Sequence, residues 1–243
     1  MRLAVNVDHI ATLRQARRAH DPEPLAAALI AEMAGAQGIT VHLRSDRRHI
    51  QDRDLELLKA GISTRLNVEM AATSEMMEIA ARLKPYQVTL VPERPQELTT
   101  EGGLDIVGNA RPAEQFTRRM RDAGVRVSIF LDPAVDQVRA ARAIGAHAIE
   151  INTGRYADAA SPDVSTAELS RIRESAQHGD AQGLEVLAGH GLNYVNVLPL
   201  LSVSEIVELN IGHSIVARAM MVGMEHATAE MLEACVRARQ GRS

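Results

Sequence analysis

The chain has 243 residues and a formal net charge of −4 at pH 7, which argues against a dedicated nucleic-acid-binding protein, because such domains are strongly basic. Hydrophobic residues make up 46% of the sequence and aromatic residues only 2%, so a core must be built from aliphatic side chains and methionine, as in tightly packed parallel strands. The single Cys235 excludes an intrachain disulfide, and no apolar run approaches the about 18 residues of a membrane helix, so we expect a cytoplasmic protein without a membrane partner.

Short aliphatic runs recur along the whole chain, and each is followed by a longer helical pattern. This alternation is typical of a parallel sheet, and eight such strands close a barrel. The predicted fold class is therefore α/β, a (β/α)8 TIM barrel with additional helices, in a single domain that spans the whole chain. A doubly wound open sheet is the alternative, although the first predicted strand is not followed by the G-x-G-x-x-G pattern of a dinucleotide-binding sheet. The predicted strands are residues 3–7, 39–43, 66–70, 88–91, 125–131, 148–152, 184–187 and 206–211.

Capping residues predict where several helices begin and end. The Asp-Pro pairs at residues 21–22 and 132–133 each open a helix, and Ser165 with Glu168 forms a capping-box pattern. Glycines mark the helix ends, at Gly35, Gly61, Gly124 and Gly145.

Two connections are longer than packing requires, residues 92–111 and residues 153–163. Long loops in compact domains are usually functional. Residues 92–111 follow a predicted strand, so we expect them to form a lid over the carboxyl-end face of the barrel, and residues 153–163 are a second candidate flap.

Polar residues stand at the carboxyl end of most predicted strands, which is where barrel enzymes build their active sites. His190 lies between two glycines at the end of one strand, and His42 ends another. Either histidine alone has a structural explanation, as a ring bonded to a carbonyl group. The residues of this polar ring are Asn6, Asp8, His9, His42, Arg44, Glu69, Glu150, Asn152, His190, Asn210, Gly212, His213 and Ser214.

Two of these residues are carboxylates inside apolar runs, Glu69 in LNVEM and Glu150 in AIEIN. Burying an unpaired carboxylate costs several kcal/mol, so both are functional candidates. Carboxylates and imidazoles that face one cavity shift each other's pKa values, which provides acids and bases near neutral pH.

The stretch LNIGHSIVARAM passes from a strand through Gly212 into a helix. Free N–H groups at a helix start attract anions, and the loops after the last barrel strands are a frequent phosphate site. Basic clusters at residues 14–20 and 44–53 also favour a small anionic ligand such as a phosphate ester. A metal site is less favoured, because the histidines are dispersed and no cysteine cluster exists.

Six long blocks together resemble the pyridoxine 5′-phosphate synthase family, and the resemblance runs the length of the chain. They are NVDHIATLRQAR at residues 6–17, GITVHLRSDRRHIQDRD at 38–54, NVEMA at 67–71, LVPERPQELTTEGGLD at 90–105, AGHGLNY at 188–194 and ELNIGH at 208–213.

This resemblance implies a barrel with extra helices that assembles as a homo-octamer, a tetramer of dimers. It implies a reaction between two phosphorylated small molecules, 1-deoxy-D-xylulose 5-phosphate and 3-amino-2-oxopropyl phosphate, which gives pyridoxine 5′-phosphate, inorganic phosphate and water. The family uses neither a metal nor an organic cofactor, so none is expected here, and nucleic acid is not an expected partner.

The resemblance also implies a role for each matching residue. His42 is expected to be a general base, Glu69 its acid/base partner, His190 a proton donor and Glu150 a stabiliser of a transition state. The expected ligands of the aminoketone phosphate are Asn6, Arg17, Gly212 and His213. The expected ligands of the pentulose phosphate are Asp8, His9, Arg44, His49 and Thr99, with Gly191 lining the site.

Two positions depart from the family pattern, Leu187 where asparagine is common and Asn152 where histidine is common. The residues that surround His190 and Glu150 are therefore expected to differ from those of other family members. Two alternatives remain open from the sequence, another barrel enzyme that converts phosphorylated sugars and a catalytically silent barrel that binds phosphate.

Overall fold

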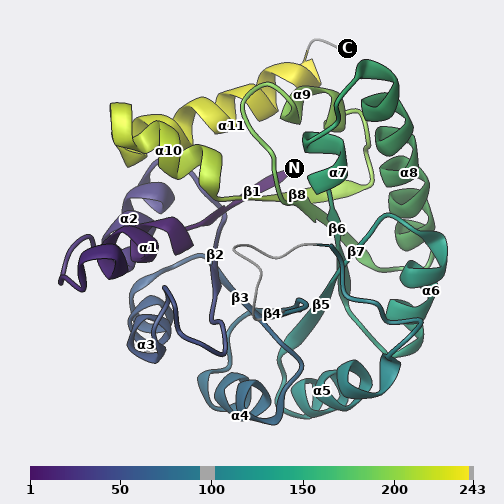
Figure 1. Ribbon diagram of the computed structural model, residues 1–243, viewed down its shortest axis with the longest axis horizontal. Helices are drawn as coiled ribbons and strands as arrows, with labels where there is room; N and C mark the ends of the chain where they lie inside the picture. The colour runs from purple at the N-terminus through teal and green to yellow at the C-terminus, as the bar shows by residue number, and fades with distance from the viewer. Residues whose placement is uncertain (94–101, 241–243) are drawn as a thin grey trace.

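The computed structural model describes residues 1–93 and 102–240, with the backbone alone for residues 237–240. Eight parallel strands form a closed barrel in sequence order, as predicted (Figure 1). Each observed strand lies within two residues of its predicted position at either end, because the aliphatic runs that predicted the strands are the residues that pack outward against the helices. The strands are β1 (Arg2–Asn6), β2 (Gly38–His42), β3 (Arg65–Met70), β4 (Gln87–Leu90), β5 (Arg126–Leu131), β6 (Ala148–Asn152), β7 (Glu185–Gly189) and β8 (Ile206–Ile211).

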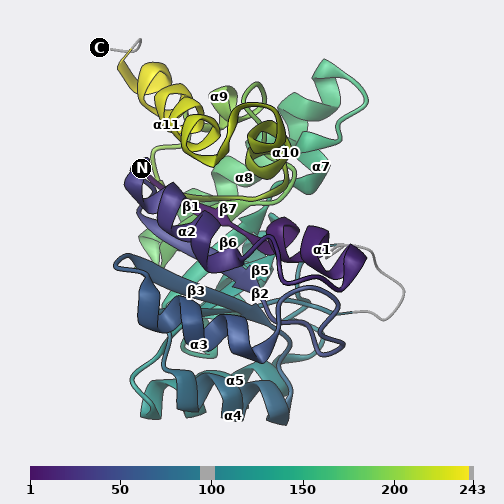
Figure 2. The same cartoon turned by 90° about the vertical axis from the view of Figure 1, so that its left-hand side faces the viewer.

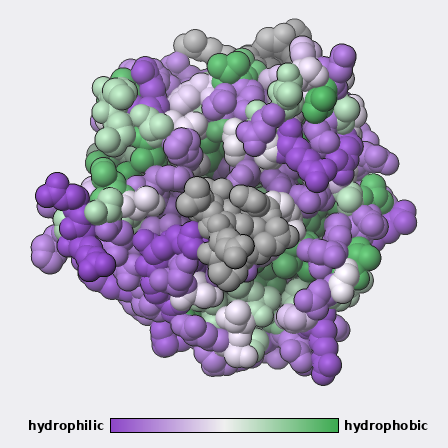
Figure 3. All heavy atoms as spheres, in the orientation of Figure 1, coloured by the Kyte–Doolittle hydropathy of each residue, from purple (hydrophilic) through white to green (hydrophobic). Residues whose placement is uncertain are grey.

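Helices surround the barrel in the ribbon views (Figures 1 and 2). Figure 1 looks onto the carboxyl ends of the strands, and the space-filling view of that face shows hydrophilic side chains over much of its surface (Figure 3). None of the helices in the described part of the chain is long and apolar enough to cross a membrane. The helices are α1 (Asp8–Arg17), α2 (Pro24–Met33), α3 (Asp52–Gly61), α4 (Ser74–Leu83), α5 (Ala110–Asp122), α6 (Val135–Ala143), α7 (Gly154–Ala157), α8 (Pro162–Ala181), α9 (Val197–Leu200), α10 (His213–Val222) and α11 (Met224–Gln240).

The interior of the barrel is polar. Strand β2 shows the alternation: Ile39 and Val41 belong to the hydrophobic core, while Thr40 and His42 stand beside the polar Asn67 and Glu69 of β3. Hydrogen bonds run between strands at this level, for example from Thr40 Oγ1 to Asn210 Oδ1 at 3.2 Å. Because a buried polar group without a partner is costly, this network fixes the strand register as well as the side chains.

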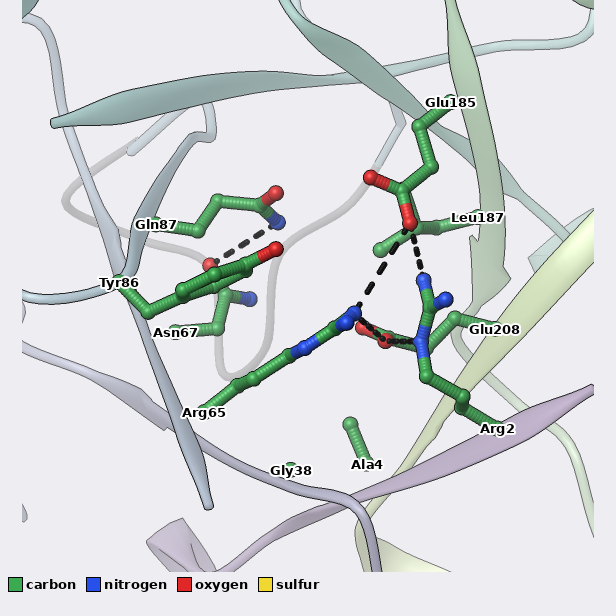
Figure 4. A pocket seen from close by; sticks show the side chains of 10 residues that line it. All are labelled: Arg2, Ala4, Gly38, Arg65, Asn67, Tyr86, Gln87, Glu185, Leu187 and Glu208. Carbon is green, nitrogen blue, oxygen red and sulfur yellow. Dashed lines mark hydrogen bonds and ion pairs between the residues drawn. The ribbon is translucent and has the colours of Figure 1, made fainter. Parts of the chain in front are cut away.

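An ionic cluster closes the amino end of the barrel (Figure 4). Arg2 pairs with Glu208 at 2.6 Å and also with Glu185, and Arg126 pairs with Glu185 at 2.5 Å. The guanidinium of Arg65 lies 4.8 Å from the centre of the Tyr86 ring, within the range of cation–π attraction. The cavity left between these side chains is about 10 Å³, no larger than about one water molecule. Any ligand of ordinary size must therefore bind elsewhere.

Leu187 lines this amino-end cavity and is 1% exposed. Its register partner is Glu150 on β6. The departure at position 187 therefore lies inside the barrel below the end of β7, where an aliphatic side chain fills space beside a buried carboxyl group.

Three helix starts differ from prediction. The helix predicted at Ser165 begins at Pro162, because Ser161 is its N-cap and accepts a hydrogen bond from the Val164 N–H. Proline is well suited to the first turn, where its missing N–H has no helical partner. Helices α2 and α6 begin two residues after the predicted Asp-Pro pairs, at Pro24 and Val135.

The second candidate flap, residues 153–163, contains helical structure. Most of residues 153–163 is helical: α7 fills its first half and α8 starts at its end. Tyr156 is 4% exposed, and its hydroxyl donates to the Asn196 carbonyl at 2.6 Å. The first part of the segment is packed against the barrel, whereas residues 158, 160, 162 and 163 are exposed, and its role as a flap stays a prediction.

The predicted lid lies partly outside the described residues, since residues 94–101 are not among them. The chain that follows is tied to the barrel: the Gly103 N–H donates to Asp132 Oδ1 and the Leu104 N–H to the Phe130 carbonyl, at 2.9 and 2.8 Å. Gly103 lies so close to β5 that an added Cβ would be 2.1 Å from the Asp132 nitrogen, which only glycine permits.

A buried ion pair fixes α1 to α3 beside the barrel mouth. The two terminal guanidinium nitrogens of Arg14, Nη1 and Nη2, donate to the carboxylate of Asp54 at 2.9 and 2.6 Å. Asp54 is 1% exposed and also accepts from the Gln51 N–H at 2.9 Å, which completes the capping box of α3.

We expect Arg14→Met to lower the free energy of unfolding by about 3 kcal/mol, because the Asp54 charge stays buried after its partner is lost. The measurement is urea unfolding at fixed protein concentration. The matched control is Arg82→Met, since Arg82 is 66% exposed and 4.0 Å from Glu56; its free energy should change by less than about 0.5 kcal/mol. Equal effects of the two substitutions would contradict the stabilising role of the Arg14–Asp54 pair.

Candidate active site

The carboxyl ends of the strands carry the predicted site residues. His42 ends β2 and Glu69 lies near the end of β3, while His190 directly follows β7. Glu150 is the middle residue of β6, and its carboxyl group lies beside Gly189 at the end of β7. Gly212 follows β8 and starts α10. Since all strands are parallel, these groups belong to the same end of the barrel.

His42 lies between two carboxyl groups. Its side chain is 6% exposed, with Nδ1 3.9 Å from Glu69 Oε2 and Nε2 3.0 Å from Glu93 Oε1. Burial alone would raise the pKa of Glu93, but the hydrogen bonds from His42 and from the Ser45 N–H outweigh it and lower that pKa to about 2. Glu93 is therefore ionised at neutral pH.

The pKa values of Glu69 and Glu150 are shifted in the opposite direction, upward. Burial, together with the charges of Glu150 and Asp8, holds the pKa of Glu69 well above its ordinary value. Burial also raises the pKa of Glu150 to about 8, with a further contribution from Glu208 and a partial offset by the hydrogen bond from Asn210. The pKa values of Glu69 and Glu150 are therefore raised at the same barrel end at which the pKa of Glu93 is lowered.

Asp8 joins β1 to β2 at the mouth. Its Oδ1 accepts from the His42 N–H at 2.8 Å, and its Oδ2 accepts from Asn6 Nδ2 at 2.9 Å. Asn6 in turn accepts from the Asp8 N–H at 2.8 Å. This closed set of bonds fixes the backbone that carries His42.

The backbone around His190 has an unusual conformation, with φ values of +82° at His190 and +74° at Gly191. Thr153 Oγ1 holds this turn by donating to the His190 carbonyl at 2.6 Å. The ring lies against Gly154, where an added Cβ would be 2.9 Å from His190 Cδ2, and its centre is 6.2 Å from that of Phe130. Burial lowers the pKa of His190, and the charge of Asp158 opposes the shift.

Gly212 is the N-cap of α10, as the sequence predicted, and lies directly beside Asn6, since an added Cβ would be 2.9 Å from the Asn6 Cβ. The rings of His9 and His213 meet edge to face at 5.0 Å. Burial lowers the pKa of His9, with Asp8 opposing and His213 adding to the shift. Asn6, His9, Gly212 and His213 therefore come together at the free N–H groups of a helix start, an arrangement suited to an anion.

Arg44 and His49 follow β2 on the side of His42. Arg44 is 3% exposed and its Nε is 3.7 Å from Asp46 Oδ1. The rings of His49 and His42 are 6.1 Å apart, and burial lowers the pKa of His49. A buried arginine beside two histidines adds positive charge to this edge of the mouth.

Two predicted residues are not brought into this group. Arg17 is the last residue of α1 and is exposed; α1 starts at the mouth and runs outward (Figure 1), so a ten-residue helix of about 14 Å separates Arg17 from Asp8. Thr99 lies outside the described residues.

The Asn152 side chain forms hydrogen bonds with Asp132 and with Gly154, which lies against the His190 ring. Its side-chain nitrogen donates to Asp132 Oδ1 at 2.9 Å and its oxygen accepts from the Gly154 N–H at 2.9 Å. Because Gly154 packs on the His190 ring, the asparagine at this departure from the family pattern positions that ring through its neighbour.

Sequence reasoning missed Glu93 and gave Asn210 no specific role. Glu93 lies in the PER stretch after β4, within a segment that we had assigned to a lid, and a charged residue in a loop gives no signal of burial. Asn210 Nδ2 donates to Glu150 Oε2 at 2.6 Å; the alternation of β8 already pointed Asn210 inward, which was the available signal.

The described residues contain no group of three or more histidine, cysteine, aspartate or glutamate side chains arranged to hold a metal ion. The arrangement supports proton transfer and the binding of anions. The pKa values of its carboxyl groups are shifted in opposite directions, which suits acid and base steps on one substrate.

Comparisons with known proteins agree with this chemistry. The chain is 58% identical to a pyridoxine 5′-phosphate synthase from Trichlorobacter lovleyi, over 95% of this chain and 97% of that protein. It is 57% identical to one from Alcanivorax borkumensis, over 94% of both. A thiamine phosphate pyrophosphorylase from Pyrococcus furiosus shares the fold, with a TM-score of 0.64 and 13% identity, over 98% of this chain and 96% of that one. The model of the family described as pyridoxal phosphate biosynthesis protein PdxJ matches residues 3–237, and the chain therefore belongs to this family.

Proposed function

We propose that the chain is a pyridoxine 5′-phosphate synthase, which joins 1-deoxy-D-xylulose 5-phosphate to 3-amino-2-oxopropyl phosphate and releases pyridoxine 5′-phosphate, inorganic phosphate and water. The observation that carries the proposal is the set of proton-transfer groups at one barrel end, with His42 Nδ1 3.9 Å from Oε2 of Glu69, whose pKa burial raises well above its ordinary value. The names of the full-length relatives support the same reaction.

The chemistry explains the number of acid and base groups. Condensation of the amine with the ketone, loss of phosphate, closure of a carbon–carbon bond and loss of water each move protons. One residue cannot be in the correct ionisation state for every step. A protein that performs this sequence therefore needs several groups whose pKa values differ.

His42 and Glu69 are assigned to the same side of the substrate. In this proposal His42 removes a proton as the general base, and Glu69, whose raised pKa favours its acid form, returns one to a neighbouring atom. Their 3.9 Å separation is longer than a hydrogen bond, so neither group is tied to the other by a direct hydrogen bond.

Glu150 and His190 serve the later steps. A protonated Glu150, held by Asn210, donates a hydrogen bond where negative charge develops on the substrate. Burial lowers the pKa of His190, so its protonated form gives up a proton readily. This property suits the donor that releases a leaving oxygen.

Two anion sites hold the phosphate groups. The start of α10, with Asn6, Gly212 and His213, is assigned to the aminoketone phosphate. The pentulose phosphate is assigned to Arg44 and His49 on the basic edge after β2, together with Asp8 and His9 at the start of α1, and Gly191 lines the site. Arg17 and Thr99 remain predicted ligands.

The assay that tests the function uses the purified protein with both phosphorylated substrates. We expect a new pyridine absorption band and one released phosphate for each product molecule. Omission of either substrate is the control. Product from one substrate alone would favour another enzyme of phosphorylated sugars, and binding without turnover would favour a silent phosphate-binding barrel.

We also propose that the protein assembles as a cytoplasmic homo-octamer. Apolar side chains are exposed on α10, where Met220 and Met221 are 64% and 81% exposed, and the space-filling view shows an apolar patch over this helix (Figure 3). Sedimentation equilibrium should give eight times the chain mass. A Met221→Glu variant should sediment as a smaller species if this patch is part of the assembly, and an octamer unaffected by the substitution would place the contact elsewhere.

We expect His42→Asn to reduce kcat by at least about 100-fold, the lower range for loss of a general acid or base. Substrate binding should be retained, because the anion sites are built by other residues. Steady-state kinetics and calorimetric titration with each substrate measure the two quantities. Unchanged turnover would refute the role of His42.

The raised pKa of Glu150 predicts a pH dependence of stability. A carboxyl group whose pKa is about 8 in the folded chain and 4.5 in the unfolded chain holds its proton preferentially when folded. The free energy of unfolding therefore falls as the pH rises between these values. Glu150→Gln removes this contribution, so the variant should lose less stability than the parent between pH 5 and pH 8 in urea unfolding. Parallel losses in the two proteins would contradict a protonated Glu150.

A further inference from the structure

Glu93 has no role in the assignments above, yet it makes a direct contact with the proposed general base. Its side chain is 10% exposed. Its Oε1 is 3.0 Å from His42 Nε2, and its Oε2 accepts from the Ser45 N–H at 3.1 Å. The carboxylate therefore connects the end of β4 to the end of β2 and the turn after it, across the intervening β3.

The two sides of the His42 ring are not equivalent. Glu69 Oε2 is 3.9 Å from Nδ1, too far for a direct hydrogen bond. Glu93 is within hydrogen-bond distance of Nε2, and an ionised carboxylate can only accept. A neutral imidazole carries one N–H, so the proton on the ring has to be the one that Glu93 accepts.

We propose that Glu93 is a positioning residue that fixes His42 as the Nε2–H tautomer, so that the free lone pair on Nδ1 is the base that faces Glu69 and the substrate. This role rests on the proposed function of His42. The low pKa of Glu93, caused by the bonds from His42 and Ser45 against the effect of burial, keeps the acceptor charged throughout the neutral range. A charged acceptor also stabilises the ring after it has taken up a proton.

The Ser45 N–H makes the proposal sharply testable, because a backbone N–H can only donate. In Glu93→Gln the side-chain oxygen has to face Ser45, and the amide NH2 then faces His42 Nε2. Nε2 must become the acceptor, and the ring proton moves to Nδ1. A substitution of nearly identical size therefore reverses the tautomer and blocks the proposed basic atom.

The first measurement is solid-state ¹⁵N NMR of histidine-labelled protein at pH 8, in which the His42 signals are those lost in His42→Asn. We expect the parent to show a protonated Nε2 and an unprotonated Nδ1, and Glu93→Gln to show the reverse. A parent ring that is protonated on Nδ1, or on both nitrogens, would overturn the proposal. This readout does not depend on turnover, so it stands apart from the test of the proposed function.

The second measurement is steady-state kinetics. We expect Glu93→Gln to lower kcat by about 10- to 100-fold, the range found when the partner that orients a metal-bound histidine is removed, with KM for either substrate changed less than about threefold. Glu93→Asp keeps the charged acceptor and should recover part of kcat together with the parent tautomer. A general loss of folding would instead raise KM and lower the melting temperature of both variants, and such a result would overturn the positioning role.

Glu56→Gln is the matched control, since Glu56 is 61% exposed on α3 and its nearest charged partner is Arg82 at 4.0 Å. This substitution should leave both the tautomer and kcat unchanged. If the parent shows the predicted tautomer but forms no product from the two phosphorylated substrates, the proposed reaction fails while the Glu93–His42 pairing stands.

Discussion

Burial raises the pKa of two carboxyl groups, Glu69 and Glu150, at one end of a closed barrel. The charge of Glu150 adds to the shift at Glu69. The polar interior makes this tolerable: Asn210 bonds Glu150, and neighbouring strands provide similar partners. The candidate site depends on this burial, because it favours the acid form of two carboxyl groups beside a histidine that is proposed to act as a base.

The same barrel end keeps one carboxylate ionised by giving it donors. Glu93 accepts hydrogen bonds from the His42 ring and from the Ser45 N–H. These bonds lower the pKa of Glu93 by more than burial raises it. The pKa values of the three glutamates thus differ because burial dominates at Glu69 and Glu150, while hydrogen bonds dominate at Glu93. His42 lies between a carboxyl group with a raised pKa and one with a lowered pKa, which gives its two ring nitrogens different surroundings.

Ion pairs and hydrogen bonds at the two ends of the barrel hold these groups in place. The ionic cluster of Arg2, Glu185 and Glu208 closes the amino end of the barrel, so the strands cannot shift relative to each other without breaking charged contacts. At the other end, Asp8 and Asn152 bond backbone groups next to the catalytic candidates. The proton-transfer groups are therefore held by residues that do not themselves react.

The sequence by itself determined the eight strands and most of the strand-end ring, because aliphatic runs and their period are local properties of the chain. It placed Gly212 at a helix start for the same reason. Only the tertiary structure revealed Glu93, since its contact with His42 joins residues 51 positions apart and nothing in a charged loop indicates burial. Tertiary packing also buried Tyr156 within the predicted flap at residues 153–163 and left Arg17 at the far end of α1. Ionisation was likewise decided by the fold, because a pKa depends on the groups that surround a side chain and not on its neighbours in sequence.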